Sequence, residues 1–194
     1  MDKERDFLQG KKNALNKLDN AKKEKKVDKK ILPILEIINQ SEKYYSSSSC
    51  SGRIVLIQLP EIGDKKNAEF LGKWHHIIKT EEITTSFKKA KKGQIWILAQ
   101  SPIIHVISKT LKDAEKILKI SISSGFKNSG LKSIGKKIVV EICSTERLDS
   151  PIGKNTEILC NIEYIELVVN IANSIIKRSD KKIIELKNQL KKKI

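Results

Sequence analysis

Apolar residues recur at helical spacing in four segments of the chain. Residues 2 to about 25 alternate apolar and charged positions in the way that is typical of an amphipathic helix. A second helix is expected to run through Ile38, with Asp28 as its N-terminal cap. The remaining two predicted helices cover residues 110–124, with Gly125 as a C-terminal cap, and 163 to about 192.

Short runs rich in Ile and Val, bounded by Gly, Pro and Ser, predict β-strands between these helices. A turn at 60–64 is expected to fold residues 72–79 back along residues 53–59 as a hairpin. A short basic helix is predicted over residues 84–91 and is ended by Gly93. The other predicted strands are 94–99, 103–107, 131–134, 137–143 and 157–160, with loops at 39–51 and 150–153.

This order of elements indicates an α+β fold. The strands follow one another with short connections, so the sheet should be mostly antiparallel, with helices beside it and a long helix at the C-terminus. No G-x-G-x-x-G follows the first strand, so a Rossmann-type nucleotide-binding loop is not expected. No long low-complexity linker divides the chain, and residues 1–194 are therefore predicted to form a single domain.

The charge balance points to a polyanionic partner. Lys and Arg number 39 against 23 Asp and Glu, which gives a formal net charge of +16. Nucleic acid is the first partner that such a surplus suggests, and an anionic membrane surface is the second. The alternative is that lysine only solvates the surface of a heat-adapted protein.

Cysteine and histidine usage gives no sign of a disulfide framework or a metal centre. The three cysteines are widely spaced and odd in number, which favours a reducing compartment. Histidines 75, 76 and 105 form no ligand spacing with them, so no metal is expected. The charged first residues and the absence of a long apolar run indicate a soluble, cytoplasmic protein without a membrane segment.

Two polar, glycine-bearing segments are the candidate binding loops. In the segment 46–53, Gly52 allows close approach of a ligand, and Arg53 offers a planar fork of donors to a carboxylate or phosphate. The alternative is a serine-rich surface turn. The segment 125–130 lies between two glycines in the same manner. His105 stands among apolar residues, so it is either a core histidine or a proton acceptor.

Several blocks of residues resemble the family of tRNA wybutosine-synthesising protein 3 and its archaeal relatives over essentially the whole chain. The blocks are Ser48-Ser49-Cys50-Ser51-Gly52-Arg53-Ile54, Trp74, Pro102-Ile103-Ile104-His105-Val106, Leu111-Lys112-Asp113-Ala114, Ser124-Gly125-Phe126-Lys127-Asn128-Ser129-Gly130, Ser144-Thr145, Glu163-Tyr164-Ile165 and Asn170-Ile171-Ala172-Asn173.

The resemblance implies an S-adenosylmethionine-dependent methyltransferase whose partner is tRNA(Phe). The acceptor would be N4 of the tricyclic base 7-aminocarboxypropyl-demethylwyosine, 3′ to the anticodon. Two alternatives stay open: methyl transfer to demethylwyosine without the aminocarboxypropyl chain, and a non-catalytic tRNA-binding protein.

The same resemblance implies roles for individual residues. Arg53 is expected to hold a carboxylate of cofactor or substrate, and Trp74 or Trp96 to stack on a ring, unless these tryptophans belong to the core. His105 is the expected proton acceptor, whereas a thiolate nucleophile at Cys50 is not needed for a nitrogen acceptor. The complete set of binding candidates is Ser47, Ser49, Cys50, Ser51, Gly52, Arg53, Trp74, Gly125, Lys127, Asn128, Ser129 and Gly130.

Overall fold

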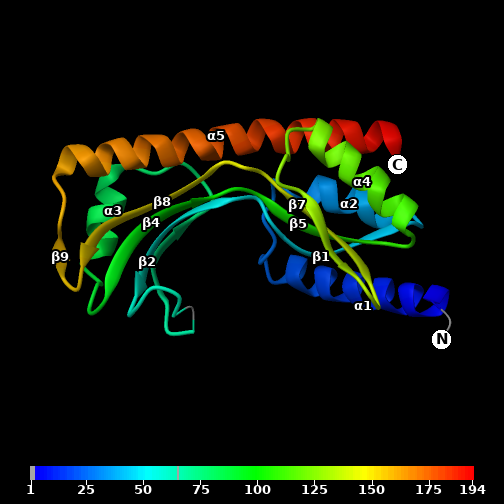
Figure 1. The fold of residues 1–194 in the computed structure, drawn as a ribbon, viewed down its shortest axis with the longest axis horizontal. Helices are drawn as coiled ribbons and strands as arrows, with labels where there is room; N and C mark the ends of the chain where they lie inside the picture. The colour runs from blue at the N-terminus through cyan, green and yellow to red at the C-terminus, as the bar shows by residue number, and fades with distance from the viewer. Residues whose placement is uncertain (1–2, 65) are drawn as a thin grey trace. The chain divides into compact units, whose positions relative to one another are not determined.

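The computed structural model describes residues 3–64 and 66–194, and in this part of the chain it contains five α-helices and nine β-strands (Figure 1). Both sheets are antiparallel, so the α+β class is confirmed and a doubly wound Rossmann arrangement is not present. The chain divides into two compact units. Unit 1 holds residues up to Ser51, Pro102–Thr145 and Ser179–Ile194, and unit 2 holds Gly52–Ser101 and Glu146–Arg178. That the whole chain acts as one domain stays a prediction.

Unit 1 is built on a four-stranded sheet with the order β1-β5-β7-β6. Its strands are β1 (Tyr44–Cys50), β5 (Ile103–Ser108), β6 (Gly130–Ile134) and β7 (Ile138–Cys143). Its helices are α1 (Lys3–Lys23), α2 (Leu32–Gln40), α4 (Leu111–Ser123) and the last part of α5 (Ile162–Lys193).

The two faces of this sheet bury different helices. Ile104 and Val140 face α2, α4 and the end of α5, and they form one hydrophobic cluster with Ile117 and Leu186. Helix α1 lies on the opposite side (Figure 1), where the rings of Phe7 and Tyr45 meet edge to face with centroids 5.2 Å apart. This second face is covered only in part, because Ile107 is buried in the α1 cluster but the His105 side chain on the same strand is 29% exposed.

Unit 2 is built on a five-stranded sheet with the order β3-β2-β4-β8-β9. Helix α3 and the first part of α5 pack on one face of it, around Leu56, Ile97 and Ala172. The strands are β2 (Arg53–Leu59), β3 (Glu69–Trp74), β4 (Gln94–Gln100), β8 (Arg147–Lys154) and β9 (Glu157–Ile158), and the helix is α3 (Thr80–Phe87).

Two predicted loops are strands, and both predictions are therefore wrong. The serine-rich segment within 39–51 forms β1 along β5, because tertiary pairing and the buried tyrosines at its start override the low strand propensity of serine. Residues 150–153 belong to β8, whose register against β4 shifts between Ile95 and Trp96. Pro151 is tolerated there because a proline can occupy an irregular position in a sheet.

Other boundaries differ from the predicted ones for local reasons. Asp28 does not cap α2, whose N-cap is Ile31 without a side-chain bond; the Asp28 carboxylate instead accepts hydrogen bonds from Ser51. Helix α3 begins at Thr80 and has two glutamates in its first turn, so it is not the predicted basic helix. Among the described residues, no helix combines the length and the apolarity that a bilayer-spanning segment needs.

Gly93 should be indispensable for the turn before β4. It has a φ of +95°, and a Cβ there would lie 2.1 Å from the carbonyl oxygen of Leu59. Gly63 has a similar φ of +92° but open space around the same position. We expect Gly63→Ala to cost about 1–2 kcal/mol of backbone strain, and Gly93→Ala to cost at least about twice as much or to prevent folding. Chemical denaturation followed by circular dichroism measures both, and equal losses would contradict the clash at Leu59.

Candidate active site

The pairing of β1 with β5 brings a serine hydroxyl to a histidine. The register changes between Ser46 and Ser48, so that Ser47 is an extra residue and Ser48 lies opposite His105. Such a β-bulge re-aims the side chains that follow it. The Oγ of Ser48 is 2.7 Å from Nδ1 of His105.

The row of polar side chains continues across the sheet. His105 is paired with Glu141 of β7, and its Nε2 is 2.9 Å from Oε2 of that carboxylate. The other carboxylate oxygen of Glu141 lies 2.8 Å from Nζ of Lys132, on the edge strand β6. Ser48, His105, Glu141 and Lys132 therefore link all four strands of unit 1, and we call them the polar row.

The electrostatics of the polar row keep Glu141 ionised. Burial opposes its charge, but hydrogen bonds from Lys132 and His105 outweigh that penalty and hold the pKa of Glu141 below its ordinary value. The bond to Glu141 in turn raises the pKa of Lys132. The Glu141 side chain is only 14% exposed, whereas those of His105 and Lys132 are 29% and 56% exposed and Ser48 is exposed, so the row is buried at Glu141 and reaches solvent on both sides of it.

These contacts define what the neutral imidazole can do. An ionised carboxylate only accepts hydrogen bonds, so in the neutral imidazole the proton is on Nε2 of His105. Nδ1 then accepts a hydrogen bond from the Ser48 hydroxyl. A carboxylate that orients a histidine whose second nitrogen meets a hydroxyl is the arrangement of a general base. The polar row can thus remove a proton from a group that is bound beside Ser48.

The sequence prediction named His105 but not its partners. Ser48, Glu141 and Lys132 were absent from the predicted site. A charged residue within the apolar run of β7 was a signal for Glu141, since a strand interior seldom carries an unpaired charge. Nothing in the sequence indicated the bulges at Ser47 and at Lys132, which set the facing pairs.

A cavity of about 520 Å³ lies beside the polar row, between β1 and helix α1. Ser47, Ser48 and Ser49 of β1 line it, and so do Lys17 of α1 and Lys137, which lies in the turn between β6 and β7. Hydroxyls and ammonium groups suit a polar ligand that carries a carboxylate. Of the predicted binding residues, Ser47 and Ser49 therefore face a common space.

The second predicted loop lies at the other end of the sheet. Gly125 ends α4 with a φ of +93°, and the loop then docks on β7 through Ser129, whose hydroxyl is 2.7 Å from the Phe126 carbonyl oxygen and 3.1 Å from the Cys143 amide. Lys127 and Asn128 are exposed. Gly130 opens β6 and pairs with Glu141. In the strand order of this sheet, β5 and β7 lie between β1, which carries residues 44–50, and β6, which begins at Gly130. Ser48 of β1 and Gly130 of β6 each lie next to a member of the polar row, His105 and Glu141 respectively.

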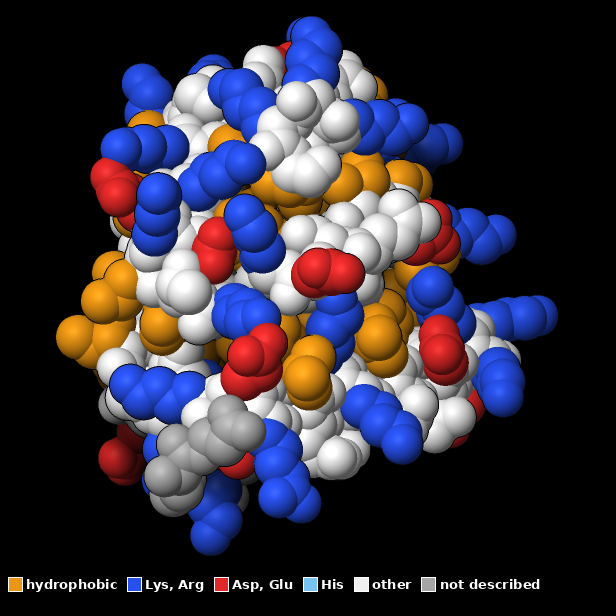
Figure 2. All heavy atoms as spheres, turned by 90° about the vertical axis from the view of Figure 1, so that its right-hand side faces the viewer, with side chains coloured by type: hydrophobic (Ala, Val, Ile, Leu, Met, Phe, Trp, Pro, Cys, Tyr) orange, Lys and Arg blue, Asp and Glu red, His pale blue; other side chains and the backbone are white. Residues whose placement is uncertain are grey.

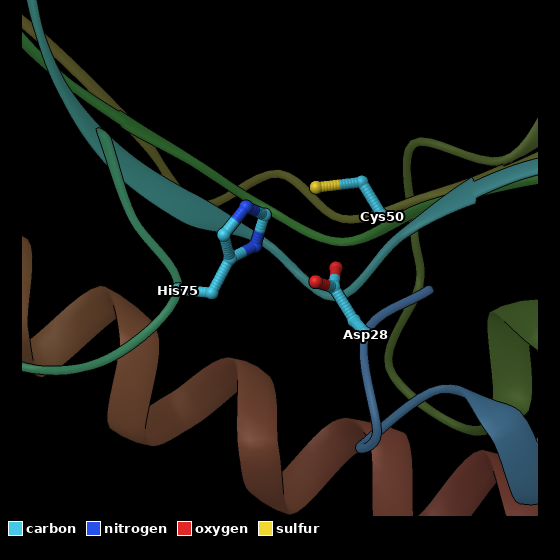
Figure 3. Close-up of side chains that lie close together, drawn as sticks. All are labelled: Asp28, Cys50 and His75. Carbon is cyan, nitrogen blue, oxygen red and sulfur yellow. The ribbon is translucent and has the colours of Figure 1, made fainter. Parts of the chain in front are cut away.

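Ser51 and Cys50 lie at the end of β1, where the chain is anchored rather than open. The backbone N–H and the hydroxyl of Ser51 both donate to Oδ2 of Asp28, at 2.9 and 3.0 Å. Figure 3 shows the Asp28 carboxylate next to Cys50. Cys50 is half-buried and not disulfide-bonded. Ser51 is 4% exposed, so its hydroxyl holds the end of β1 to Asp28 and is not open to a ligand.

The predicted residues of unit 2 gather at the start of β2. Gly52 has a φ of +92°, and its carbonyl oxygen is 3.1 Å from Nδ1 of His75, which Figure 3 also labels. The Nε of Arg53 donates to Oε1 of Gln100 at 2.7 Å. Trp74 is half-buried against the core of unit 2 and folds over Gly72, which indicates packing rather than stacking on a ligand.

Glu141 should make the stability of the protein depend on pH. Because its folded-state pKa is lowered, its contribution is present above the ordinary carboxyl pKa and is lost as the pH falls through the folded value. We expect Glu141→Gln to be less stable than the wild type by about 1–2 kcal/mol at pH 7, with the difference shrinking towards pH 3. Denaturation series at several pH values test this. Glu61→Gln, at an exposed turn, is the matched control, and a pH-independent difference for Glu141→Gln would contradict the charge pairing.

Comparison with known proteins gives one consistent result. Residues 9–192 match the family model described as "Methyltransferase TYW3". A Thermococcus kodakarensis protein named tRNA(Phe) 7-((3-amino-3-carboxypropyl)-4-demethylwyosine(37)-N(4))-methyltransferase 1 is 44% identical over 187 residues, covering 96% of this chain and 94% of its own. A Methanocaldococcus jannaschii protein with the same name, apart from the final numeral, is 38% identical over 186 residues, covering 95% and 96%.

Solved structures agree with these sequences. The PH1069 protein of Pyrococcus horikoshii has a TM-score of 0.93 at 44% identity and covers 98% of both chains. A protein of Aeropyrum pernix, at 24% identity and a TM-score of 0.74, shares the fold. The chain described here belongs to the TYW3 methyltransferase family.

Proposed function

We propose that this protein methylates N4 of 7-aminocarboxypropyl-4-demethylwyosine at position 37 of tRNA(Phe), as the names of its relatives state for them. The observation that carries the proposal is the polar row, which presents an oriented histidine beside a hydroxyl-lined cavity. Methyl transfer to a ring nitrogen needs such a group, because the nitrogen becomes a good nucleophile once its proton is lost.

The surface charge supports a tRNA substrate. Lys and Arg outnumber Asp and Glu on the face that Figure 2 shows, although acidic side chains stand among them. Helix α4 contributes lysines beside Glu115, and the last turn of α5 has three lysines. Lys112, Lys116 and Lys119 stand three or four residues apart, and therefore on one side of α4. A surface of this kind gains affinity for phosphates by releasing counterions. A tRNA substrate and cysteines that form no disulfide bonds in the described part of the chain both favour the cytoplasm as the site of action.

S-adenosylmethionine is the methyl donor that we propose, and the cavity beside β1 fits it. Its volume of about 520 Å³ falls within the range of roughly 300–1,000 Å³ that small-molecule sites occupy. Ser47 and Ser49 would hydrogen-bond its polar groups, and Lys17 or Lys137 would hold its carboxylate. When bound, the cofactor supplies an electrophilic methyl group on a sulfonium centre. Binding should raise the thermal stability of the protein, which is measurable without any turnover.

The remaining steps belong to residues of this chain. Ser48 lies between the cavity and His105, so a proton leaving N4 passes to Nδ1 of His105 directly or through the Ser48 hydroxyl. Glu141 stabilises the imidazolium that results, and Lys132 keeps Glu141 charged. Holding N4 in line with the methyl group can supply up to about 7–11 kcal/mol of the barrier, so no covalent protein intermediate is required.

The proposal is tested by one reaction. The protein is incubated with S-adenosylmethionine and tRNA from a host that lacks the gene. The tRNA is then digested, and the masses of its nucleosides are measured by mass spectrometry. A gain of one methyl mass on the aminocarboxypropyl-bearing base supports the proposal. Transfer only to demethylwyosine would shift the substrate to the simpler acceptor. Tight tRNA binding without any methylation would leave a non-catalytic tRNA-binding protein.

His105 should be needed for turnover and not for binding. We expect His105→Asn to lower kcat at least about 100-fold at neutral pH, since a positioned general base contributes at this level. The residual activity should rise with pH, because solvent then removes the proton from N4. His76→Asn, which changes an exposed histidine of unit 2, is the matched control. A His105→Asn enzyme with normal kcat would exclude the polar row from catalysis.

Arg53 is proposed to hold the carboxylate of the aminocarboxypropyl chain. Its Nε is engaged by Gln100, which fixes the plane of the guanidinium. Arg53→Lys keeps the charge but loses the planar fork, so kcat/KM should fall at least about tenfold. Steady-state kinetics at constant ionic strength measure the change. Wild-type values for the lysine variant would refute the role of Arg53 as a clamp.

A further inference from the structure

We propose that the helix-free face of the unit 2 sheet is a stacking surface for unpaired nucleotides of the RNA substrate. Helix α3 and the first part of α5 pack on the same face of this sheet (Figure 1), where Leu56 and Ile97 are fully buried. Among the described residues of unit 2, no helix covers the other face. The inference rests on the proposed function, because it names where the same tRNA is held.

Aromatic side chains stand in one row on this open face. The strand register pairs Phe70 of β3 with Ile57 of β2, and Ile57 with Trp96 of β4. Side chains of directly paired residues share a face, so the two rings flank Ile57 and their backbones lie about 10 Å apart. Phe70 is 48% exposed and Trp96 is half-buried. The indole N–H of Trp96 is satisfied by Gln94 at 3.3 Å.

Cations surround this aromatic row. The guanidinium carbon of Arg53 lies 5.5 Å from the centre of the Phe70 ring, and Nζ of Lys73 lies 4.8 Å from it. Arg147 enters the same face from β8, opposite Gln100, and pairs with the carboxylate of Asp149. Lys73 is exposed, so once a base displaces it from the Phe70 ring it can pair with the phosphate of that nucleotide.

These features fit single-stranded RNA better than a protein or a duplex. Arg53 and Lys73 lie over the Phe70 ring, so a base that stacks on the ring takes the place of one of these cations. Sheet faces with aromatic residues bind splayed bases by such stacking. A protein interface would require a larger apolar centre than the rings of Phe70 and Trp96 provide. The exposed residues around these rings include the charged Lys73, Arg147 and Asp149. A duplex hides its bases and has nothing to stack on Phe70.

The first test measures the affinity for an unmodified single-stranded RNA of about eight nucleotides by fluorescence anisotropy. Phe70→Leu keeps an apolar side chain but removes the ring, and we expect binding to weaken roughly 5- to 100-fold. Phe70→Tyr keeps the ring and should bind like the wild type. Leu167→Ala changes a side chain that is 55% exposed on α5, and it is the control for loss of exposed apolar area.

Salt dependence separates stacking from charge. Lys73→Gln should reduce the magnitude of the log–log salt slope by about 0.7, the value for one phosphate contact on a single strand. Phe70→Leu should weaken binding at every salt concentration and leave the slope unchanged. A blunt-ended RNA duplex, which has no unpaired nucleotides, should bind with the same affinity to the wild type and to Phe70→Leu.

The outcomes distinguish this inference from the proposed function. If the wild type methylates tRNA but Phe70→Leu has unchanged affinity for the oligonucleotide, the stacking surface is refuted and the function stands. If Phe70→Leu changes the sedimentation coefficient instead of the RNA affinity, the face is a protein interface and the inference is wrong. If Phe70 controls binding but no methyl is transferred, the surface stands and the proposed function fails.

Discussion

The pairing of β1 with β5 is the constraint on which the candidate active site depends. Serine has little intrinsic preference for strands, so the segment that follows Tyr45 cannot hold its place alone. Two tyrosines at its start, each 1% exposed, anchor it to both faces of the sheet. The hydroxyl of Tyr44 donates to the Asp113 carbonyl oxygen at 3.0 Å, and the ring of Tyr45 packs on Phe7. With its start fixed, the bulge at Ser47 determines that Ser48 meets His105.

The polar row then shows a balance between burial and hydrogen bonding. A carboxylate as buried as Glu141 would be protonated more easily if it were alone. Two donors from neighbouring strands reverse that tendency, and the ionised carboxylate fixes the proton on Nε2 of His105. The buried charge of Glu141 therefore has a role in the function that we propose. It keeps the proton of the neutral His105 on Nε2, so that Nδ1 can accept the proton from the substrate. Lys132 reaches Glu141 from the second bulge, so both irregular positions in the sheet serve this row.

The sequence predicted the parts of the fold that depend on periodic patterns. The long C-terminal helix, the capped helix before Gly125 and most strands were correct because apolar spacing and glycine caps are local signals. It did not predict β1, since the reason that serines form a strand there is their partner β5, whose His105 lies 57 residues beyond Ser48. For the site, the residue types at His105 and Ser47 were informative, but their partners depend on register, and a shift of one residue turns every side chain to the other face.

The segment from Ser48 to Arg53 divides its residues between chemistry and structure, although all look alike in the sequence. Ser48 contacts a histidine and is exposed, whereas Ser51 gives both its donors to Asp28 and is buried. Cys50 lies between them in the sequence, and its thiol is therefore a candidate nucleophile. A nitrogen acceptor brings its own electron pair, however, so the reaction that we propose needs a base and not a covalent adduct. The base is on β5, and the serine that faces it, rather than the cysteine, is the residue of this segment closest to the chemistry.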